Sequence, residues 1–457
     1  MRTRSTTPRR LAGSAPREHR SPLPSPGAAA VVVGIGRSGL AVARYLAEHG
    51  VRVRAVDQRP ASELADQLGG LPADTEVRAG GYDTSVLEGC VAVFASPGVP
   101  WDAPLLEAAR RRGLAVSSEI DLFFERCPGE IVGVTGTNGK TTTTAMLGAI
   151  LSRGARPVLV GGNIGDTVLD RLHEITVAHR VVLELSSFQL ESVAAPRARV
   201  GVVLNITPDH LDRHHTLQAY VDAKARLVEA LPPDATAVLN RADPTCRALA
   251  ERSRARVVWF DEHRPAPRLR IPGRHNELNA LAAAATARAL GFDDSRIQAG
   301  LDRFTGVEHR LELVPTGDGV RWYNDSKATN PEAGLPALRS FPEQPVVLIA
   351  GGRGSGFDLR QWASEVRRQT LAAVLIGESA PLLSEVLRGH PVHRSPSLED
   401  AVELAGRIVP QGGVVLLSPA YKSYDMFRNF EERGRRFKAA VRSRAGVGAA
   451  GPQEKTR

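Results

Sequence analysis

Cysteine and long apolar segments are the scarcest features of this 457-residue chain. Its three cysteines are Cys90, Cys127 and Cys246, and an odd number at wide spacing favours reduced, buried thiols over disulfides or a zinc site. No apolar run approaches the ~18 residues that a transmembrane helix needs, and the N-terminus lacks the apolar core of a signal peptide. We therefore expect a soluble, cytoplasmic protein with no membrane partner.

An acidic excess is also absent, because the formal net charge is +9. Residues 1–27 hold six arginines against one glutamate, which leaves the rest of the chain with only about +4. That charge is too diffuse for a nucleic-acid footprint and fits a pocket for anionic substrates. Five prolines in residues 1–27 oppose the amphipathic helix of a transit peptide. We predict that both this tail and residues 448–457 are disordered.

The most informative stretch, residues 131–144, is an apolar strand that runs into a glycine-rich turn and then a helix. Such a turn directs backbone N–H groups and a helix N-terminus at one anion, here the triphosphate of ATP. Lys140 would contact the β- and γ-phosphates, and the Thr141 hydroxyl would bind Mg²⁺. The strict motif requires glycine at 134, where this chain has Val134. The match is therefore to a shorter motif beginning at Gly136, and a structural turn is the alternative.

A second glycine-rich turn, Gly34-Ile-Gly36-Arg-Ser-Gly39, follows a predicted strand over 28–33. A helix to about residue 49 and a strand over 51–56 come next, and Asp57 ends that strand. This layout is typical of a dinucleotide-binding βαβ unit and by itself favours a nicotinamide enzyme. However, one chain rarely needs two unrelated nucleotide sites for hydride transfer. The first turn can instead hold the diphosphate of another nucleotide.

Polar residues collect where consecutive predicted strands end. Glu184 lies near the end of a strand over 180–185, and Asp209 and His210 follow a strand over 200–204. Carboxylates and histidines on the edge that carries Lys140 suit a metal-assisted phosphoryl transfer. Asn276 and Asn279 are three residues apart and share one face of a predicted helix, from which both can reach a nucleoside. Helix capping is the alternative for either asparagine.

Taken together, the motifs resemble the Mur ligases of peptidoglycan synthesis over about residues 28–445. The matching segments are Gly-Thr-Asn-Gly-Lys-Thr, Gly-Gly-Asn-Ile-Gly, Glu-Leu-Ser-Ser-Phe-Gln-Leu-Glu, Asp-His-Leu-Asp-Arg, His-Asn-x-x-Asn, His309-Arg310, Asn-Asp-Ser-Lys-Ala-Thr-Asn and Leu-Leu-Ser-Pro-Ala. The resemblance implies an α/β protein of three domains with mostly parallel sheets. These are a Rossmann-like UDP-binding domain (28–121), a central P-loop ATPase-like domain (122–304) and a C-terminal Rossmann-like ligase domain (305–447).

The resemblance implies an ATP-dependent ligase that forms a carbon–nitrogen bond in the cytoplasmic stage of peptidoglycan synthesis. The terminal carboxylate of UDP-N-acetylmuramoyl-L-alanine would become an acyl phosphate, which the amino group of D-glutamate then attacks. Ligation of L-glutamate, or of another amino acid by a Mur-type enzyme, is the alternative. The expected cofactors are ATP and two Mg²⁺ ions, and the expected state is a monomer. A nicotinamide oxidoreductase and a non-catalytic nucleotide sensor are the rival classes.

Site residues follow from matching the family motifs position by position. The UDP substrate is expected at Ser38, Asp57, Arg59, Ser96, Asn163 and Ser186. ATP is expected at Gly136, Thr137, Asn138, Gly139, Lys140, Thr141, Thr142, Asn276, Asn279, Arg310 and Asp325. Metal ligands are expected at Thr141, Glu184, His210 and Lys224, and catalytic roles at Lys140, Lys224, His210 and Lys327. Lys224 stands where these ligases carry a carbamylated lysine.

The expected glutamate site departs from the family pattern at one position. Thr329, Ser423 and Phe430 stand at matching places, but Ser355 replaces the expected lysine. A dicarboxylic substrate still needs a cation, because a buried unpaired carboxylate is costly. We predict that Arg353, in the same loop, or Lys422 supplies it, and we favour Arg353 for its bidentate geometry.

Overall fold

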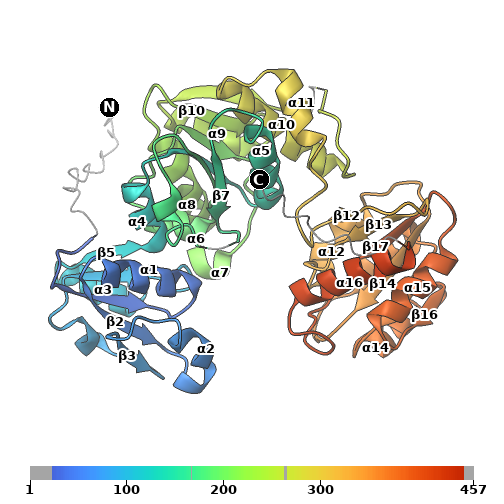
Figure 1. Cartoon of the computed structure of the whole chain (residues 1–457), viewed down its shortest axis with the longest axis horizontal. Helices are drawn as coiled ribbons and strands as arrows, with labels where there is room; N and C mark the ends of the chain where they lie inside the picture. Colours follow the sequence, from blue (N-terminus) through green and yellow to red (C-terminus); the bar gives the residue numbers. More distant parts are fainter. Residues whose placement is uncertain (1–22, 166, 262–264, 447–457) are drawn as a thin grey trace, which may run out of the picture. The chain divides into compact units, whose positions relative to one another are not determined.

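The computed structural model describes residues 23–165, 167–261 and 265–446, and most of the two predicted disordered tails lies outside them. The chain divides into two compact units (Figure 1). The first contains residues 23–128, 167–175 and 188–197, and the second contains the other described residues. Residues 23–27, which were predicted in the tail, belong to the first unit, where the Gly27 N–H donates to Gly50 O at 2.8 Å.

The first unit is built on five parallel strands in the order β3-β2-β1-β4-β5. Alternate residues of β1 face opposite cores, with Ala30 and Val32 in one and Val31 and Val33 in the other, so the sheet is buried on both faces. Its strands are β1 (Ala29–Val33), β2 (Arg52–Asp57), β3 (Glu76–Ala79), β4 (Ala92–Ala95) and β5 (Ala115–Ser118), and its helices are α1 (Arg37–Glu48), α2 (Ala65–Leu68), α3 (Pro104–Arg111) and α4 (Glu119–Arg126).

Two segments that the sequence places in the central domain pack in the first unit. Arg44 forms an ion pair with Asp170 at 2.8 Å, and Ser192 Oγ donates to Ser118 Oγ at 2.8 Å. These contacts join segment 167–175 to α1 and segment 188–197 to the end of β5. A single boundary at residue 121 therefore does not separate the two compact units, because the chain returns to the first unit twice.

The second unit begins with a six-stranded parallel sheet in the order β11-β10-β9-β6-β8-β7. Helix α10 packs against α5, and both contribute to the core beside this sheet. The strands are β6 (Glu130–Thr135), β7 (Val158–Gly162), β8 (Arg180–Glu184), β9 (Val200–Val203), β10 (Thr236–Asn240) and β11 (Arg256–Phe260), and the helices are α5 (Lys140–Leu151), α7 (Leu211–His214), α8 (Leu217–Glu229), α9 (Pro244–Arg252), α10 (Arg274–Ala289) and α11 (Asp294–Leu301). Helix α6 (Ser187–Ser192) lies between β8 and β9 in the chain, but its residues after Ser187 belong to the first unit.

A third sheet follows, with strand order β12-β13-β17-β14-β15-β16, and only its edge strand β12 is antiparallel to its neighbour. Alternate residues of β14 enter two separate cores, as expected for a sheet covered on both faces. The strands are β12 (Glu312–Val314), β13 (Arg321–Asn324), β14 (Val346–Gly351), β15 (Ala372–Ile376), β16 (Val392–Arg394) and β17 (Val414–Leu417), and the helices are α12 (Pro331–Leu338), α13 (Arg360–Gln369), α14 (Ala380–Val386), α15 (Leu398–Ile408) and α16 (Phe430–Arg444).

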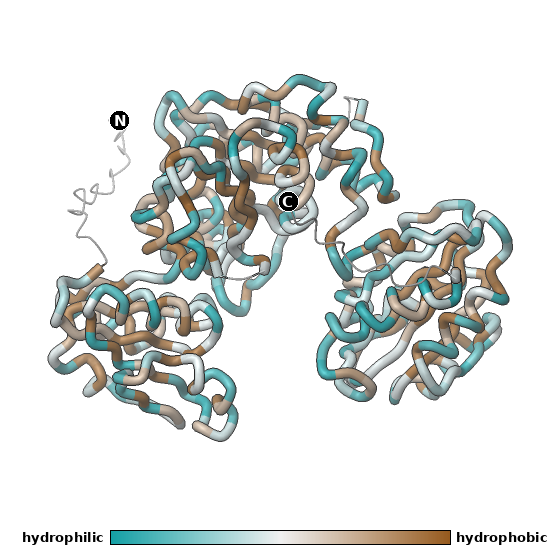
Figure 2. Tube along the Cα trace, viewed as in Figure 1, coloured by the Kyte–Doolittle hydropathy of each residue, from teal (hydrophilic) through white to brown (hydrophobic). Residues whose placement is uncertain are grey.

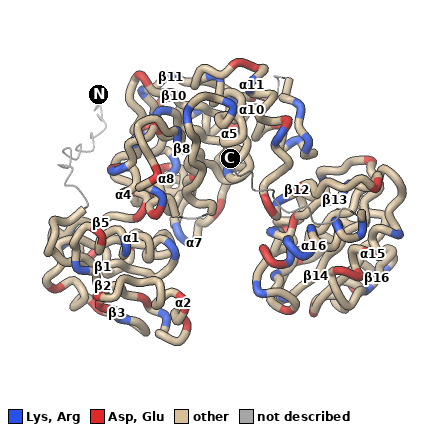
Figure 3. The backbone as a smooth tube through the Cα atoms, in the orientation of Figure 1, with Lys and Arg blue, Asp and Glu red and all other residues tan. Residues whose placement is uncertain are grey.

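The predicted fold class, three α/β domains with mostly parallel sheets, is confirmed. Apolar residues concentrate on the sheet strands (Figure 2), and basic and acidic residues are interspersed over both units (Figure 3). Within the described part of the chain, none of the helices has the length and apolar character needed to cross a membrane.

Candidate active site

The predicted phosphate-binding turn lies between the end of β6 at Thr135 and the start of α5 at Lys140. Gly139 has a φ of +84°, and a Cβ there would lie 2.2 Å from Asn279 Oδ1, so only glycine fits. Lys140 Nζ donates to Gly136 O at 3.0 Å and to Thr137 O at 2.8 Å. Burial lowers the pKa of Lys140, and the negative charge of Glu184 opposes that shift. The Lys140 ammonium is therefore bound to the carbonyls of its own turn, and phosphate oxygens can replace these carbonyls as its hydrogen-bond acceptors.

Glu184, at the end of β8, is a buried carboxylate with one unsatisfied oxygen. Glu184 is 2% exposed, and its Oε1 accepts a hydrogen bond from Asn163 Nδ2 at 3.0 Å. The other oxygen, Oε2, is buried without a hydrogen-bond partner among the described residues. Because an unpaired buried carboxylate oxygen is costly, this atom fits a hard divalent cation. Thr141 is also buried and immediately follows Lys140 in α5.

Lys224, on α8, is 1% exposed and contacts the phosphate-binding turn. Its Nζ donates to Gly136 O at 2.9 Å, the carbonyl that Lys140 also binds, and lies 4.6 Å from the centre of the Tyr220 ring. Burial, followed by the positive charge of Lys140, lowers the pKa of Lys224 to about 7. A large fraction of this amine is therefore neutral at physiological pH.

His210 precedes α7 in a left-handed backbone conformation, with φ of +51°. Its side chain is half exposed, and Nε2 lies 3.6 Å from Asp209 Oδ2. Across the described residues there is no group of three or more His, Cys, Asp or Glu side chains arranged to hold a metal. A divalent cation near Glu184 would thus need substrate oxygens among its ligands, as Mg²⁺ in phosphoryl-transfer sites commonly does.

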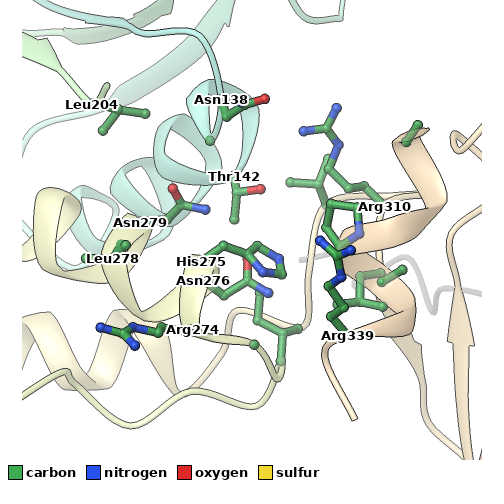
Figure 4. A pocket seen from close by; sticks show the side chains of 18 of the residues that line it. Asn138, Thr142, Leu204, Arg274, His275, Asn276, Leu278, Asn279, Arg310 and Arg339 are labelled. Atoms are coloured by element: carbon green, nitrogen blue, oxygen red, sulfur yellow. The ribbon is translucent and has the colours of Figure 1, made fainter. Parts of the chain in front are cut away.

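A pocket of about 860 Å³ in the second unit is lined by residues of the turn before α5, of α10 and of the C-terminal segment (Figure 4). Figure 4 shows Thr142, Asn276 and Asn279 on one side of the pocket and Arg310 and Arg339 on the other. The volume falls in the usual range for a small-molecule site. The lining includes Asn138, Gly139, Thr142, Asn276, Asn279, Arg310, Asp325, Lys327 and Arg339. Seven of the predicted ATP-binding residues are therefore brought together.

Asp325 forms a buried acidic part of the pocket wall. Ser418 Oγ donates to its Oδ2 at 2.9 Å, and the Leu311 N–H donates to its Oδ1 at 3.2 Å. Burial raises the pKa of Asp325 to about 7, although the hydrogen bond from Ser418 opposes the shift. Lys327, two residues further on, lies with Nζ 5.9 Å from the centre of the Phe430 ring. Phe430 is thereby placed beside a predicted catalytic lysine.

The predicted glutamate residues lie on neighbouring loops of the third sheet. The Arg353 backbone N–H donates a hydrogen bond to Lys422 O at 2.8 Å, so the two candidate cations lie on backbone segments that pair with each other. Arg353 forms two hydrogen bonds with the Glu378 carboxylate, at 2.9 and 2.5 Å. The Lys422 ammonium makes no hydrogen bond or ion pair with the residues that the structure describes. Arg353 is thus already neutralised, whereas Lys422 is available.

Arg433, which is not among the predicted site residues, is fully buried in α16. Its guanidinium donates to Tyr421 O at 3.0 Å and to Ser326 O at 2.9 Å. It therefore ties the segment before Thr329 to the loop that carries Lys422. The available indication was its position on the same helical face as Phe437 and Val441, which are buried. Burial lowers the pKa of Arg433 to about 10.

Four predicted UDP-substrate residues lie in the first unit, around the first glycine-rich turn. Asp57 accepts hydrogen bonds from the Ile35 N–H at 2.8 Å and from Arg59, with which it forms an ion pair at 2.8 Å. Burial alone would raise the pKa of Asp57, but these hydrogen bonds outweigh it and lower the pKa to about 2. Ser96 Oγ donates to Gly34 O at 2.7 Å, and Ser38 is half-buried in the first turn of α1. Asn163 and Ser186 belong to the second unit.

Three family models match this chain in order. They are described as "Mur ligase MurD-like, N-terminal domain" over residues 28–118, "Mur ligase middle domain" over 134–269 and "Mur ligase, glutamate ligase domain" over 309–421. Together they cover most of the chain. The chain belongs to the Mur ligase family.

Named relatives match along nearly the whole length. The UDP-N-acetylmuramoylalanine--D-glutamate ligase of Pelotomaculum thermopropionicum is 42% identical over 447 residues, covering 90% of this chain and 97% of the relative. The enzyme of the same name from Anaeromyxobacter dehalogenans is 42% identical over 455 residues, covering 92% of this chain and 98% of the relative.

Solved structures of other members share the fold. UDP-N-acetylmuramate-alanine ligase MurC from Thermotoga maritima is 21% identical with a TM-score of 0.57, and the match covers 91% of this chain and 99% of that one. MurF from Acinetobacter baumannii is 20% identical with a TM-score of 0.57, and the match covers 92% and 91% of the two chains. The family match leaves the nicotinamide interpretation of the first glycine-rich turn without support.

Proposed function

We propose that this protein is an ATP-dependent ligase that joins D-glutamate to UDP-N-acetylmuramoyl-L-alanine in the cytoplasmic stage of peptidoglycan synthesis. Relatives that carry this name are 42% identical over nine-tenths of the chain. The main structural support for the proposal is that Lys140 Nζ and Lys224 Nζ both donate hydrogen bonds to the same carbonyl, Gly136 O. The Lys140 ammonium and the buried Lys224 amine at this turn, beside the unsatisfied Glu184 oxygen, suit transfer of a phosphoryl group.

The chemistry follows from the weak reactivity of a carboxylate. The terminal carboxylate of the UDP substrate attacks the γ-phosphorus of ATP, the bond to ADP breaks, and an acyl phosphate forms. The glutamate amine then attacks the acyl carbon, an amide forms, phosphate leaves and the amine releases a proton. Lys140 and Arg310 balance the developing negative charge, and the turn holds the reacting groups in line.

Magnesium fits the residues beside the turn. Thr141 and Glu184 would hold one ion, and His210, with Lys224 in its modified form, would hold a second. Bound Mg²⁺ neutralises the phosphate charges during transfer. The chain itself contributes a buried carboxylate oxygen with no other partner among the described residues, and this oxygen is the feature that supports a resident cation.

Carbamylation of Lys224 is supported by its environment. The amine is buried, its pKa is lowered to about 7, and the positive Lys140 lies nearby. In the reaction, the neutral amine adds to carbon dioxide, a C–N bond forms and one proton is released. The product is a carbamate anion, which removes an unfavourable ammonium and supplies an anionic ligand for a second cation.

The amino-acid site would lie at Thr329, Ser423 and Phe430, with Arg353 or Lys422 as the cation for the glutamate side chain. Glu378 now occupies the Arg353 guanidinium. If Arg353 is the cation, the substrate carboxylate must displace Glu378, which is feasible because exposed ion pairs are weak. If Lys422 is the cation, no displacement is needed.

Phosphate release from ATP, measured with UDP-N-acetylmuramoyl-L-alanine and a panel of D- and L-amino acids, tests the function. We expect turnover with D-glutamate and little with neutral amino acids. Turnover with L-glutamate alone would move the specificity to that enantiomer. A strong preference for a neutral amino acid, or no ATP turnover with any of them, would contradict the proposal. Mass determination of the native protein tests the expected monomer.

A further inference from the structure

The loop after β9 is bonded to the phosphate-binding turn through Asn205. The Thr137 N–H donates to Asn205 O at 2.8 Å, and the Asn138 N–H donates to Asn205 Oδ1 at 2.9 Å. In return, Asn205 Nδ2 donates to Asn138 O at 3.1 Å. The carboxamide therefore satisfies both backbone polar groups of Asn138, as a neighbouring strand would.

The same two segments are bonded again two residues further along the loop. The Thr207 N–H donates to Thr137 Oγ1 at 3.0 Å, and Thr137 Oγ1 donates to Thr207 O at 3.1 Å. The backbones are also in close contact, since a Cβ at Gly136 would lie 3.3 Å from Asn205 N. The turn and the loop thus form one bonded unit that ends shortly before His210.

We propose that Asn205 is a positioning residue that presets the phosphate-binding turn and couples it to the His210 loop. The proposal rests on the proposed function only for the identity of the ligand. Because Asn138 is held on both its N–H and its C=O, the peptide groups around it cannot rotate freely. The Gly139 N–H belongs to the same peptide group as the Asn138 carbonyl that Asn205 binds, so this donor of the turn is oriented before the nucleotide binds, which lowers the cost of binding it.

Two variants of Asn205 separate its bonds. Asn205→Ala removes both bonds to Asn138, whereas Asn205→Asp keeps the shape and one acceptor but places a carboxylate beside Asn138 O and the bound phosphates. We expect the Kd for Mg-ADP, measured by titration calorimetry, to rise ~10-fold in the alanine variant and further in the aspartate variant. The KM for ATP should rise in parallel, while the KM for glutamate stays within about twofold of the parent value.

Gln298 offers a matched control. Its Nε2 donates to Arg268 O at 3.0 Å and its Oε1 accepts from the Arg268 N–H at 3.1 Å, which is the same two-way bond to a loop backbone. Gln298→Glu should lower the Tm and leave the Kd for Mg-ADP unchanged. This comparison separates positioning of the turn from general loss of stability.

The outcomes are distinguishable. A Kd for Mg-ADP within about twofold of the parent in both Asn205 variants would overturn the proposal, as would an equal rise in Gln298→Glu. If the alanine variant does not fold, the aspartate variant decides the matter. A parent protein that binds no Mg-ADP would contradict the proposed function itself rather than the role of Asn205.

Discussion

The predicted phosphate-binding site of the central sheet and the predicted glutamate-binding loops of the C-terminal sheet hold their charges in opposite ways. Glu184 and Lys224 are 2% and 1% exposed, and each is bonded within the protein. Arg353 and Glu378 instead pair through side chains that are 54% and 55% exposed. Lys422, beside them, is exposed as well.

This difference matters because burial changes what a charge costs. A buried charge that loses its partner is strongly destabilising, whereas a surface ion pair contributes little and exchanges easily. In the function that we propose, phosphoryl transfer would thus depend on groups that cannot rearrange cheaply, and selection of the amino acid on groups that can. The following predictions test the contrast in order of expected effect.

Lys140→Ala should have the largest effect. The side chain lies in a turn and fills no core, so the variant should fold normally and lose at least ~100- to 1,000-fold in kcat. Steady-state phosphate release and a thermal melt check both parts. Arg360→Ala, which removes an exposed arginine paired with Asp358, is the control and should keep the parent rate. Turnover near the parent rate in Lys140→Ala would exclude the assigned role.

Lys224→Ala should also be inactive, but partly recoverable. Formate can occupy the space of a carbamate and restore an anionic ligand, so added formate should raise the activity of Lys224→Ala. Lys224→Arg leaves no such space and should stay inactive with formate, as should Lys140→Ala. Full activity of either Lys224 variant, or equal recovery in all three, would contradict carbamylation.

The exposed glutamate loops should give a smaller and more selective effect. Removing the cation that binds the substrate side chain should raise the KM for glutamate about 10-fold and leave the KM for ATP unchanged. Kinetics of Arg353→Ala and Lys422→Ala identify that cation. Glu378→Gln adds a second comparison, because it should lower the KM for glutamate only if Arg353 is the cation. An unchanged KM for glutamate in both Arg353→Ala and Lys422→Ala would show that neither residue binds glutamate.

Stability should depend on pH through Lys224. Since its pKa falls from the ordinary value of 10.5 to about 7, the unfolded chain binds more protons than the folded chain between these pH values. Stability contributed through this group therefore rises with pH across that window. Lys224→Met lacks the effect. Urea unfolding in carbon dioxide-free buffer gives the free energy of unfolding of the parent and of Lys224→Met. The excess stability of the variant over the parent should shrink from pH 7 to pH 10. A difference that stays constant with pH would contradict a neutral buried amine.

Much of the site was predictable because its motifs are local. A strand, a glycine-rich turn and a helix follow one another within residues 131–144, so the phosphate-binding turn is readable from the chain. Asn276 and Asn279 share a face through helix geometry alone, and both are buried in α10. The roles assigned to individual residues remain predictions until the variants are measured.

Partners across long sequence separations were not predictable. Lys224 reaches Gly136 across 88 positions, and Arg353 meets Glu378 across 25. The second case changes the interpretation of the glutamate loop, because the favoured cation already has an anionic partner. Arg433 and Asn205 acquire their importance in the same way, through backbone groups that the fold brings to them.

The sequence by itself determined the fold class, the glycine-rich turn between β6 and α5 and the family, because these depend on periodicity and on the spacing of motifs within short segments. Only the tertiary structure decided which charges are buried, which oxygen of Glu184 lacks a partner and how far the pKa of Lys224 falls. Those properties arise from desolvation and from neighbours that are distant in the chain, and neither is encoded in any single segment.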